Sequence, residues 1–277
     1  MSSVGYVEPT AAQRLVGDVG EMLREQHDYR ELLYQMTRRD LLLRYKQTVM
    51  GFGWAVFMPV INTILFSVVF MRVAPVQTRV AYPLFAFCGL LVWNFTASAL
   101  RFSVTSLTAN TNLVTKVYFP REIFPFSAVA VSFVDYAVAA TALVAMMIYY
   151  GVAPTATVLL LPTIIAIHAM FTAALALLLA MANLFYRDVK YLFDVFLTVW
   201  MFASAVVYPV EGIGGWTGAL IHANPMTGIV EAYRSVLLYG TMPEPIAFGW
   251  TTAVTLILLP SAWLVFHRCE FRFAENI

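Results

Sequence analysis

Four stretches of this sequence contain no Asp, Glu, Lys or Arg over more than 20 consecutive residues: 47–71, 80–100, 136–186 and 245–267. A helix that crosses a lipid bilayer needs about 20 consecutive apolar residues. Uncharged runs of this length are hard to place in the core of a soluble protein. We therefore expect the chain to fold into helices that lie within a membrane.

The composition supports this expectation. The chain is 61% hydrophobic and 12% charged, whereas soluble domains are about 45–50% apolar and about 25% charged. This composition excludes a soluble enzyme and a disordered chain. The net charge of +1 argues against binding to nucleic acid. Cys88 lies in an apolar run and Cys269 in a polar tail, so neither a disulfide nor a metal site is expected.

The uncharged stretch 136–186 is too long for one helix, and it is interrupted by a Gly/Pro turn signal at 151–155. The helix before this turn begins near Ile123 and contains one carboxylate, Asp135. The helix 191–209 is the weakest prediction, because its uncharged part is confined to 195–210. We predict an all-α integral membrane protein with about six spanning helices, near 51–72, 80–103, 123–150, 155–185, 191–209 and 246–267.

The basic residues predict the orientation of these helices. If both termini are cytoplasmic, 14 of the 17 Lys and Arg residues fall in cytoplasmic segments, and only Arg72, Arg79 and Arg234 fall outside. Cytoplasmic loops of membrane proteins carry such an excess. An odd number of spans would spoil this distribution, which supports the helix 191–209. Residues 1–46 contain no apolar run typical of a cleavable signal peptide, so the first spanning helix is expected to direct insertion.

Two amphipathic helices are expected before the first span. Apolar residues recur at helical spacing within 15–23, and a second set, Tyr29, Leu32, Leu33, Met36 and Leu43, lies on one face of 29–46. Such helices commonly lie in the membrane interface. The same pattern also fits a solvated helix packed on the bundle.

Two connecting segments have unusual patterns. The cytoplasmic loop 110–122 is expected to hold a short helix followed by a break at Pro120. The pattern fits equally a compact projection that a cytoplasmic partner binds and an ordinary connecting loop. On the outer side, 205–245 contains two apolar stretches too short to span, separated by 223–225. We predict two re-entrant helices there, with a cap lying flat as the alternative, and Glu231 paired with Arg234 at i, i+3.

Catalytic chemistry is poorly represented in the sequence. It contains no G-x-x-x-x-G-K-[ST] loop for ATP phosphates, no G-x-S-x-G and no H-E-x-x-H. His168, inside a predicted span, is more typical of a helix–helix hydrogen bond than of a ligand. Asp135 is a functional candidate, because ionisable groups within membranes usually have a role; the alternative is a carboxyl group that is neutral or bonded to a neighbouring helix. The sequence offers no spaced Lys or Arg partner for Asp135, which argues against a proton relay.

Aromatic residues form two stripes at i, i+3, i+7. One is Trp54, Phe57 and Ile61, and the other is Phe193, Phe196 and Trp200, with Tyr208 beyond it. Sugar rings stack on aromatic faces, so such stripes suit a passage for carbohydrate. From the residues alone, side chains that face lipid or form interfacial belts are the favoured explanation.

Three segments stand out together: RELL at 30–33 with RRDL at 38–41 and RYKQTVMGFGWA at 44–55, NLVTKVYFPRE at 112–122, and NPMT at 224–227 with Glu231 and Arg234. In order, spacing and six-span layout they resemble the type-2 ABC exporter permeases for polysaccharides. The resemblance covers 28–277. Close members of that family export lipid-linked O-antigen, teichoic acids or related cell-wall glycans. Residues 1–27 are an N-terminal extension to which the resemblance assigns no role.

The resemblance implies a homodimeric transport subunit in the bacterial inner membrane. It would work with two copies of a separate ATPase subunit, which would bind ATP and Mg²⁺, while this chain would carry no cofactor. The residues it singles out are the ATPase-coupling Asn112, Lys116, Phe119, Pro120, Arg121 and Glu122; the interface-helix Arg38, Arg39, Asp40, Arg44 and Tyr45; the channel-lining Trp54, Phe57, Phe193, Phe196, Trp200 and Tyr208; and the periplasmic-gate Pro209, Asn224, Pro225, Glu231 and Arg234.

Other functions stay open at this point. An exporter of drugs or small lipids would have the same layout. An ion-driven or proton-driven secondary transporter would use Asp135 as its coupling group. A membrane glycosyltransferase or acyltransferase is disfavoured, because the sequence shows no cluster of carboxylates or histidines.

Overall fold

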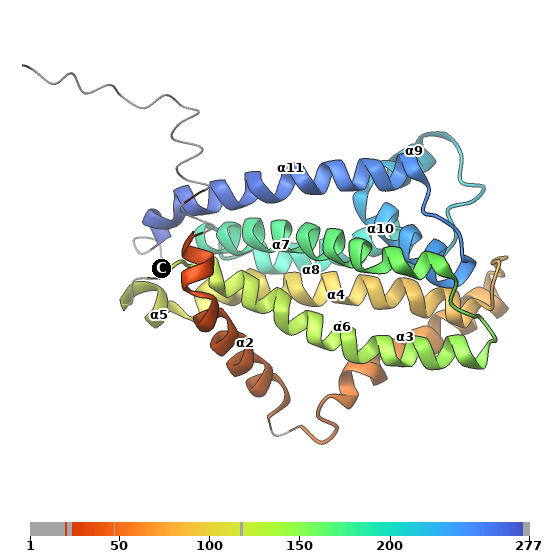
Figure 1. The fold of residues 1–277 in the computed structure, drawn as a ribbon, viewed down its shortest axis with the longest axis horizontal. Helices are drawn as coiled ribbons and strands as arrows, with labels where there is room; N and C mark the ends of the chain where they lie inside the picture. Colours follow the sequence, from red (N-terminus) through yellow and green to blue (C-terminus); the bar gives the residue numbers. More distant parts are fainter. Residues whose placement is uncertain (1–19, 21–23, 47, 117–118, 274–277) are drawn as a thin grey trace, which may run out of the picture.

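The computed structural model describes residues 20, 24–46, 48–116 and 119–273. All regular elements within these ranges are helices, arranged as an elongated bundle (Figure 1). They are α2 (Arg30–Tyr45), α3 (Gly53–Val68) with a π-helical turn (Val69–Val73), α4 (Tyr82–Ala109), α5 (Thr111–Lys116), α6 (Ile123–Tyr149), a 3₁₀ turn (Ala156–Leu160), α7 (Leu161–Phe185), α8 (Val189–Ala203), α9 (Gly215–Ala223), α10 (Pro225–Arg234) with a π-helical turn (Ser235–Tyr239), α11 (Pro245–Cys269) and a 3₁₀ turn (Glu270–Arg272). The expected helix at 15–25 falls almost entirely outside the described residues.

Five of the six predicted spans are confirmed as helices of sufficient length and hydropathy. Within the described ranges, the segments that meet both conditions are Gly53–Val73, Tyr82–Ala109, Ile123–Tyr149, Ala156–Phe185 and Pro245–Arg272. Prolines occupy the first turn of α4, α7, α10 and α11. A proline is tolerated there because its missing N–H would have no partner within the helix.

The predicted span 191–209 is shorter than expected. Helix α8 ends at Ala203 and has 15 residues, which makes it roughly 22 Å long at 1.5 Å per residue, less than the hydrocarbon thickness of about 30 Å. The chain leaves the helix at Ser204 and turns at Ala205, which has a positive φ of 50°. The prediction was wrong beyond Ala203, because an apolar sequence can continue through a turn.

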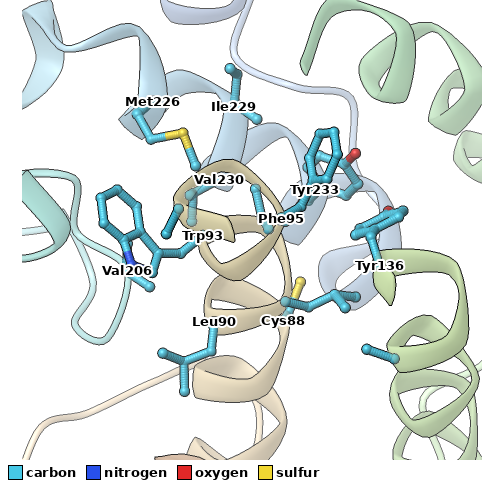
Figure 2. Packing of buried hydrophobic residues seen from close by; sticks show 14 of the residues in the cluster. Cys88, Leu90, Trp93, Phe95, Tyr136, Val206, Met226, Ile229, Val230 and Tyr233 are labelled. Atoms are coloured by element: carbon cyan, nitrogen blue, oxygen red, sulfur yellow. The ribbon is translucent and has the colours of Figure 1, made fainter. Parts of the chain in front are cut away.

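Helix α4 forms the centre of the bundle, with α6, α7, α3, α10 and α8 packed around it. Most of its residues are buried, and most of those are apolar, as expected of a helix at the centre of a bundle. Figure 2 shows Trp93 and Phe95 of α4 near Met226, Val230 and Tyr233 of α10. Apolar side chains gain little free energy on moving from lipid into the protein interior, because lipid tails are equally apolar. Close packing and interhelical hydrogen bonds therefore hold the bundle together.

Helices α3 and α8 are covered on one side only. In α3 the buried residues are Pro59 and Thr63, and in α8 they are Phe193 and Leu197. Many of the other large apolar side chains of both helices are exposed. The two predicted outer helices are present as α9 and α10, separated by Asn224. They lie at the end of the bundle opposite α5 and the C-terminal turn (Figure 1).

Candidate functional site

The end of α2 is anchored to the bundle through Asp135 of α6. Arg44 forms an ion pair with the Asp135 carboxylate, and the Tyr45 hydroxyl donates a hydrogen bond to its other oxygen. Arg44 also donates to Ser98 Oγ of α4 at 2.7 Å and lies over the Phe102 ring, 4.1 Å from its centroid. Burial, together with the bond to Asp135, raises the pKa of the Tyr45 hydroxyl, which therefore stays protonated as a donor.

Asp135 is therefore bonded to a neighbouring helix, the alternative that the sequence left open, and its charged partner is Arg44. Its side chain is 15% exposed and that of Arg44 is 21% exposed. An ion pair at this depth is the usual way in which a membrane protein accommodates a charge. Helical spacing could not reveal this partner, because the arginine comes from α2.

The middle of α2 makes further polar contacts. Arg39 pairs with Asp40 at 2.8 Å and donates to Asn110 Oδ1 at 3.1 Å, while Asp40 accepts from Ser127 Oγ at 3.1 Å. Arg38 is exposed. The apolar residues Tyr29, Leu32, Leu33 and Met36 rest on a cluster formed by the bundle itself. The apolar face of α2 is therefore packed on the protein, while Leu42 and Leu43 remain exposed.

A cavity of about 580 Å³ lies beside the Arg44–Asp135 pair. Its walls come from α2, α3, α4 and α6. Trp54, Asn62, Asn94 and Arg101 line it together with apolar residues. The cavity can accommodate a molecule that has both polar and apolar parts.

The loop between α4 and α6 contains the expected short helix, α5, and then turns back into the bundle. Phe119 is 4% exposed and packs against Phe124, with ring centroids 5.5 Å apart. Arg121 pairs with Glu270 at 2.9 Å, and Glu122 accepts a hydrogen bond from Trp263 Nε1 at 3.2 Å. These residues anchor the loop within the chain.

The side chains of 119–122 are more buried than that of Asn112, the other predicted coupling residue whose side chain is described. Pro120 is buried like Phe119 and Glu122, and Arg121 is mostly covered. Asn112, on α5, is exposed. The side chain of Lys116 lies outside the described part of the chain. Of the coupling residues with described side chains, only Asn112 is fully accessible to a partner.

The two aromatic stripes lie on different helices that do not face each other. Trp54 and Phe57 of α3 meet edge to face, with centroids 5.5 Å apart. In α8, Phe196 stacks on Trp200 at 5.6 Å, while Phe193 is buried. Helix α3 packs mainly on α4 and α6, whereas α8 packs mainly on α4 and α7. The described contacts within one chain therefore do not enclose a passage between the stripes.

At the end of the bundle that carries α9 and α10, Arg234 is fully buried and holds the turn that follows α8. Its Nη1 donates to the carbonyl of Ala205 at 3.0 Å and to Glu231 Oε1 at 2.7 Å, and its Nη2 donates to the carbonyl of Val206. The guanidinium lies over the Phe85 ring at 3.6 Å. The predicted Glu231–Arg234 pair is confirmed, and the arginine also binds backbone that the sequence did not indicate.

Gly89 of α4 makes this arrangement possible, and sequence reasoning missed it. A Cβ added there would lie 2.2 Å from the carbonyl oxygen of Val206 and 2.6 Å from Arg234 Nη2. A glycine inside an apolar helix is the sequence signal of such a close approach, but it does not identify the neighbour.

Asn224 connects the two outer helices to α8. Its Oδ1 accepts from the Met226 backbone N–H at 3.1 Å, which caps α10, and from Trp200 Nε1 at 3.3 Å. Its Nδ2 donates to the carbonyl of Ala203 at 3.1 Å. Pro225 fills the first turn of α10. The predicted gate residue Asn224 and the predicted channel residue Trp200 are therefore in direct contact.

The remaining predicted residues of this region lie in the turn after α8. The Tyr208 hydroxyl donates to the carbonyl of Phe202, which closes the turn. Pro209 is half-buried next to it. Arg79 and Glu211 pair at 3.1 Å, and both line a cavity of about 500 Å³ to which Glu231 also contributes.

His168 links helices in the core, as the sequence suggested. Its Nε2 lies 2.7 Å from Thr96 Oγ1 of α4, and its Nδ1 lies 3.4 Å from the Tyr233 hydroxyl. Thr96 also contacts Thr172 Oγ1 at 3.2 Å. These bonds join α4, α7 and the outer segment α10.

Comparisons with known proteins agree with this architecture. The family described as "ABC-2 type transporter" matches residues 31–238. An O-antigen export system permease protein RfbA of Myxococcus xanthus is 29% identical over 258 residues, which cover 92% of this chain and 99% of that protein. A protein of the same name from Klebsiella pneumoniae is 28% identical over 247 residues, which cover 88% and 94% of the two chains.

Proposed function

Because the chain belongs to the ABC-2 type transporter family, we propose that it is the membrane-spanning subunit of an ATP-driven exporter of O-antigen or a similar lipid-linked cell-wall polysaccharide. The observation that carries this proposal is the similarity to the O-antigen export permease of Myxococcus xanthus, which covers 99% of that protein. The family and the five long apolar helices make the chain a multi-pass membrane protein and a transport subunit rather than an enzyme. The family also implies association with an ATPase partner.

The partner that we propose is a separate ATPase subunit, present in two copies, which binds ATP and Mg²⁺. This chain needs no cofactor of its own for that role. In the proposed orientation both termini are on the cytoplasmic side of the inner membrane, where 14 of the 17 basic residues gather. The exposed side of α5, with Asn112, is then available to the ATPase.

A second copy of the chain would complete the passage. One chain leaves the outer sides of α3 and α8 uncovered, and each carries an aromatic stripe that includes an exposed Phe, Phe57 or Phe196. In a homodimer with two-fold symmetry, α3 of one copy can face α8 of the other. Aromatic rings from both copies would then line a path suited to stacking sugar rings.

The proposed transport cycle follows from the contacts that hold α2, the segment 119–122 and the turn after α8. Closure of the two ATPase subunits displaces α5, and the buried residues 119–122 transmit the displacement to α6 and α11. The Arg44–Asp135 pair carries it to α2 and hence to α3. At the outer end, Asn224 and Arg234 hold the turn after α8, so opening there requires these contacts to change.

Substitution on α5 tests the coupling step without disturbing the buried anchor. Replacement of 119–121 by alanines would remove a buried aromatic ring and an ion pair, so loss of export would follow from local unfolding as well as from lost coupling. The exposed Asn112→Arg variant, combined with Lys116→Glu, is expected to abolish O-antigen export and to weaken co-purification with the ATPase. A single charge change at the exposed Lys190, Lys190→Gln, has the same net effect on charge and is expected to leave co-purification unchanged.

The outcome of that experiment decides the proposal. Normal export and co-purification by the α5 variant would overturn the coupling role of the loop. Cargo is tested separately, by complementing a strain that lacks its own O-antigen export permease and staining surface polysaccharide. An exporter of drugs or small lipids would restore none. For a carrier driven by ions through Asp135, transport would continue when the ATPase partner is inactivated.

A further inference from the structure

Three residues from distant parts of the sequence meet at the end of the bundle that carries α5 and the C-terminal turn. They are Glu25, which precedes α2, Glu122, which precedes α6, and His267, in the last turn of α11. One carboxylate oxygen from each glutamate and one ring nitrogen of the histidine all lie within 4.8 Å of one another.

Glu122 is the central residue of this group. It is 1% exposed, and its Oε1 accepts a hydrogen bond from Trp263, while its Oε2 has no hydrogen-bond partner among the described residues. The neighbouring Arg121 is directed to Glu270. A buried carboxylate with one hydrogen bond and no cation at hydrogen-bond distance is costly, because that bond replaces only part of the hydration that it has lost.

His267 supplies only part of the missing compensation in the observed arrangement, because its contact with Glu122 is a long ion pair. Its Nδ1 is 3.9 Å from Glu122 Oε1 and 3.8 Å from Glu270 Oε2. Both separations exceed the length of a hydrogen bond, and Nδ1 has no hydrogen-bond partner within the part of the chain that the structure describes. The group therefore combines carboxylates that repel one another with a ring nitrogen. His267 Nδ1 lies nearly 4 Å from the carboxylate oxygen of Glu122.

We propose that Glu25, Glu122 and His267 bind a divalent transition-metal ion of the zinc type. Zinc is held in proteins by imidazole nitrogen and carboxylate oxygen at about 2.0–2.2 Å, which places tetrahedral ligand atoms about 3.4 Å apart. A contraction of about 0.5 Å between Glu122 and His267, and of at most about 1.4 Å for the separations from Glu25, would reach that spacing. The imidazole ligand favours zinc over Ca²⁺ or Mg²⁺, which prefer oxygen ligands alone.

The site gives the segment before α2 a defined attachment. A bound ion would join that segment to the residue at which the 110–122 loop enters α6, and to the end of α11. Binding of the ion at this site would require neither the cargo nor the ATPase. The sequence did not indicate this site, because the three residues follow no ligand spacing and none of them is a cysteine.

Metal content provides the test. The full-length chain, purified through a tag without histidine, is stripped with a chelator, dialysed against Zn²⁺ in the presence of excess Mg²⁺, and analysed by elemental mass spectrometry. About one zinc per chain is expected to be retained. Glu122→Gln and His267→Ala are each expected to weaken zinc binding at least tenfold, and His222→Ala, at the opposite end of the bundle, to leave it unchanged.

Glu25→Gln keeps the test decisive if the buried variants fail to fold, because Glu25 lies outside the bundle helices and is partly exposed. It is also expected to weaken zinc binding at least tenfold. The proposal is overturned if the wild-type chain retains no stoichiometric zinc, or if Glu25→Gln binds zinc as tightly as the wild type.

Discussion

The contact between Gly89 and the turn after α8 gives a sharp prediction about packing. Gly89→Ala adds one methyl group to α4, the most buried helix of the bundle. Gly249→Ala is the matched control, because Gly249 is also within a helix, α11, and a Cβ added there meets nothing within 4 Å. We expect the first substitution to destabilise the protein and the second to leave it unchanged or slightly more stable.

The magnitude follows from the neighbours of the added atom. Alanine in place of a helical glycine normally stabilises a helix by about 1 kcal/mol. At Gly89 the new carbon would lie 2.2 Å from the backbone carbonyl oxygen of Val206, which must move together with the arginine bound to it. Overpacking costs about 1–3 kcal/mol, and a lost hydrogen bond from a charged donor costs about 1.5–3 kcal/mol. The net destabilisation of Gly89→Ala is therefore about 2–5 kcal/mol.

Thiol labelling provides a readout at the site itself. Cys88, next to Gly89, is free and fully buried, so it reacts with a thiol reagent only when α4 becomes exposed on heating. In a Cys269→Ser background, Gly89→Ala is expected to lower the labelling midpoint by at least about 4 °C, from about 2–4 °C per kcal/mol in a chain of this size. A midpoint for Gly89→Ala equal to or above that of Gly249→Ala would refute the packing argument.

Three further predictions concern polar contacts, each measured by thermal unfolding of the solubilised chain. Arg44→Gln and Asp135→Asn each leave a charge unpaired and should cost about 2–4 kcal/mol, whereas the double variant should recover most of the loss; purely additive losses would contradict the pairing. Asn224→Ala removes the cap of α10 and should cost about 1–2 kcal/mol, and an unchanged midpoint would argue against that cap. Thr96→Val leaves the His168 ring without its closest partner and should cost about 1–3 kcal/mol, and a neutral result would show that this bond contributes little.

The positions of the helices could largely be predicted from the sequence, because a bilayer imposes a minimum length on each apolar segment. The same rule failed at α8. Hydropathy continues through Val206 and Val207, but the backbone turns at Ala205. The carbonyls of this turn are bound by Tyr82 and Arg234, which come from other elements. A helix end fixed by tertiary contacts leaves little trace in the local sequence.

The candidate site was predicted less completely. The resemblance singled out the segment 119–122 as a contact for the ATPase, but Phe119 and Glu122 face the interior of their own chain. Sequence similarity cannot separate a residue that touches a partner from one that supports the loop. Asp135 has no basic partner at helical spacing, and its partner on another helix leaves no local signal. Gly89 signals a close approach to α4, but nothing in that helix identifies the carbonyl that approaches it.

The partly buried Arg44 and the fully buried Arg234 indicate which parts of the chain can move. Arg44 binds α2 to α6 and to Ser98 of α4, and Arg234 binds α10 to the turn after α8 and lies over Phe85 of α4. Helix α4 therefore contacts both anchors, and displacing it would disturb both at once. Helices α3 and α8 leave most of their surface uncovered, so a shift of either helix would disrupt less packing. If the chain opens a path for a polysaccharide, we expect α3 and α8 to move relative to a core formed by α4, α6 and α7.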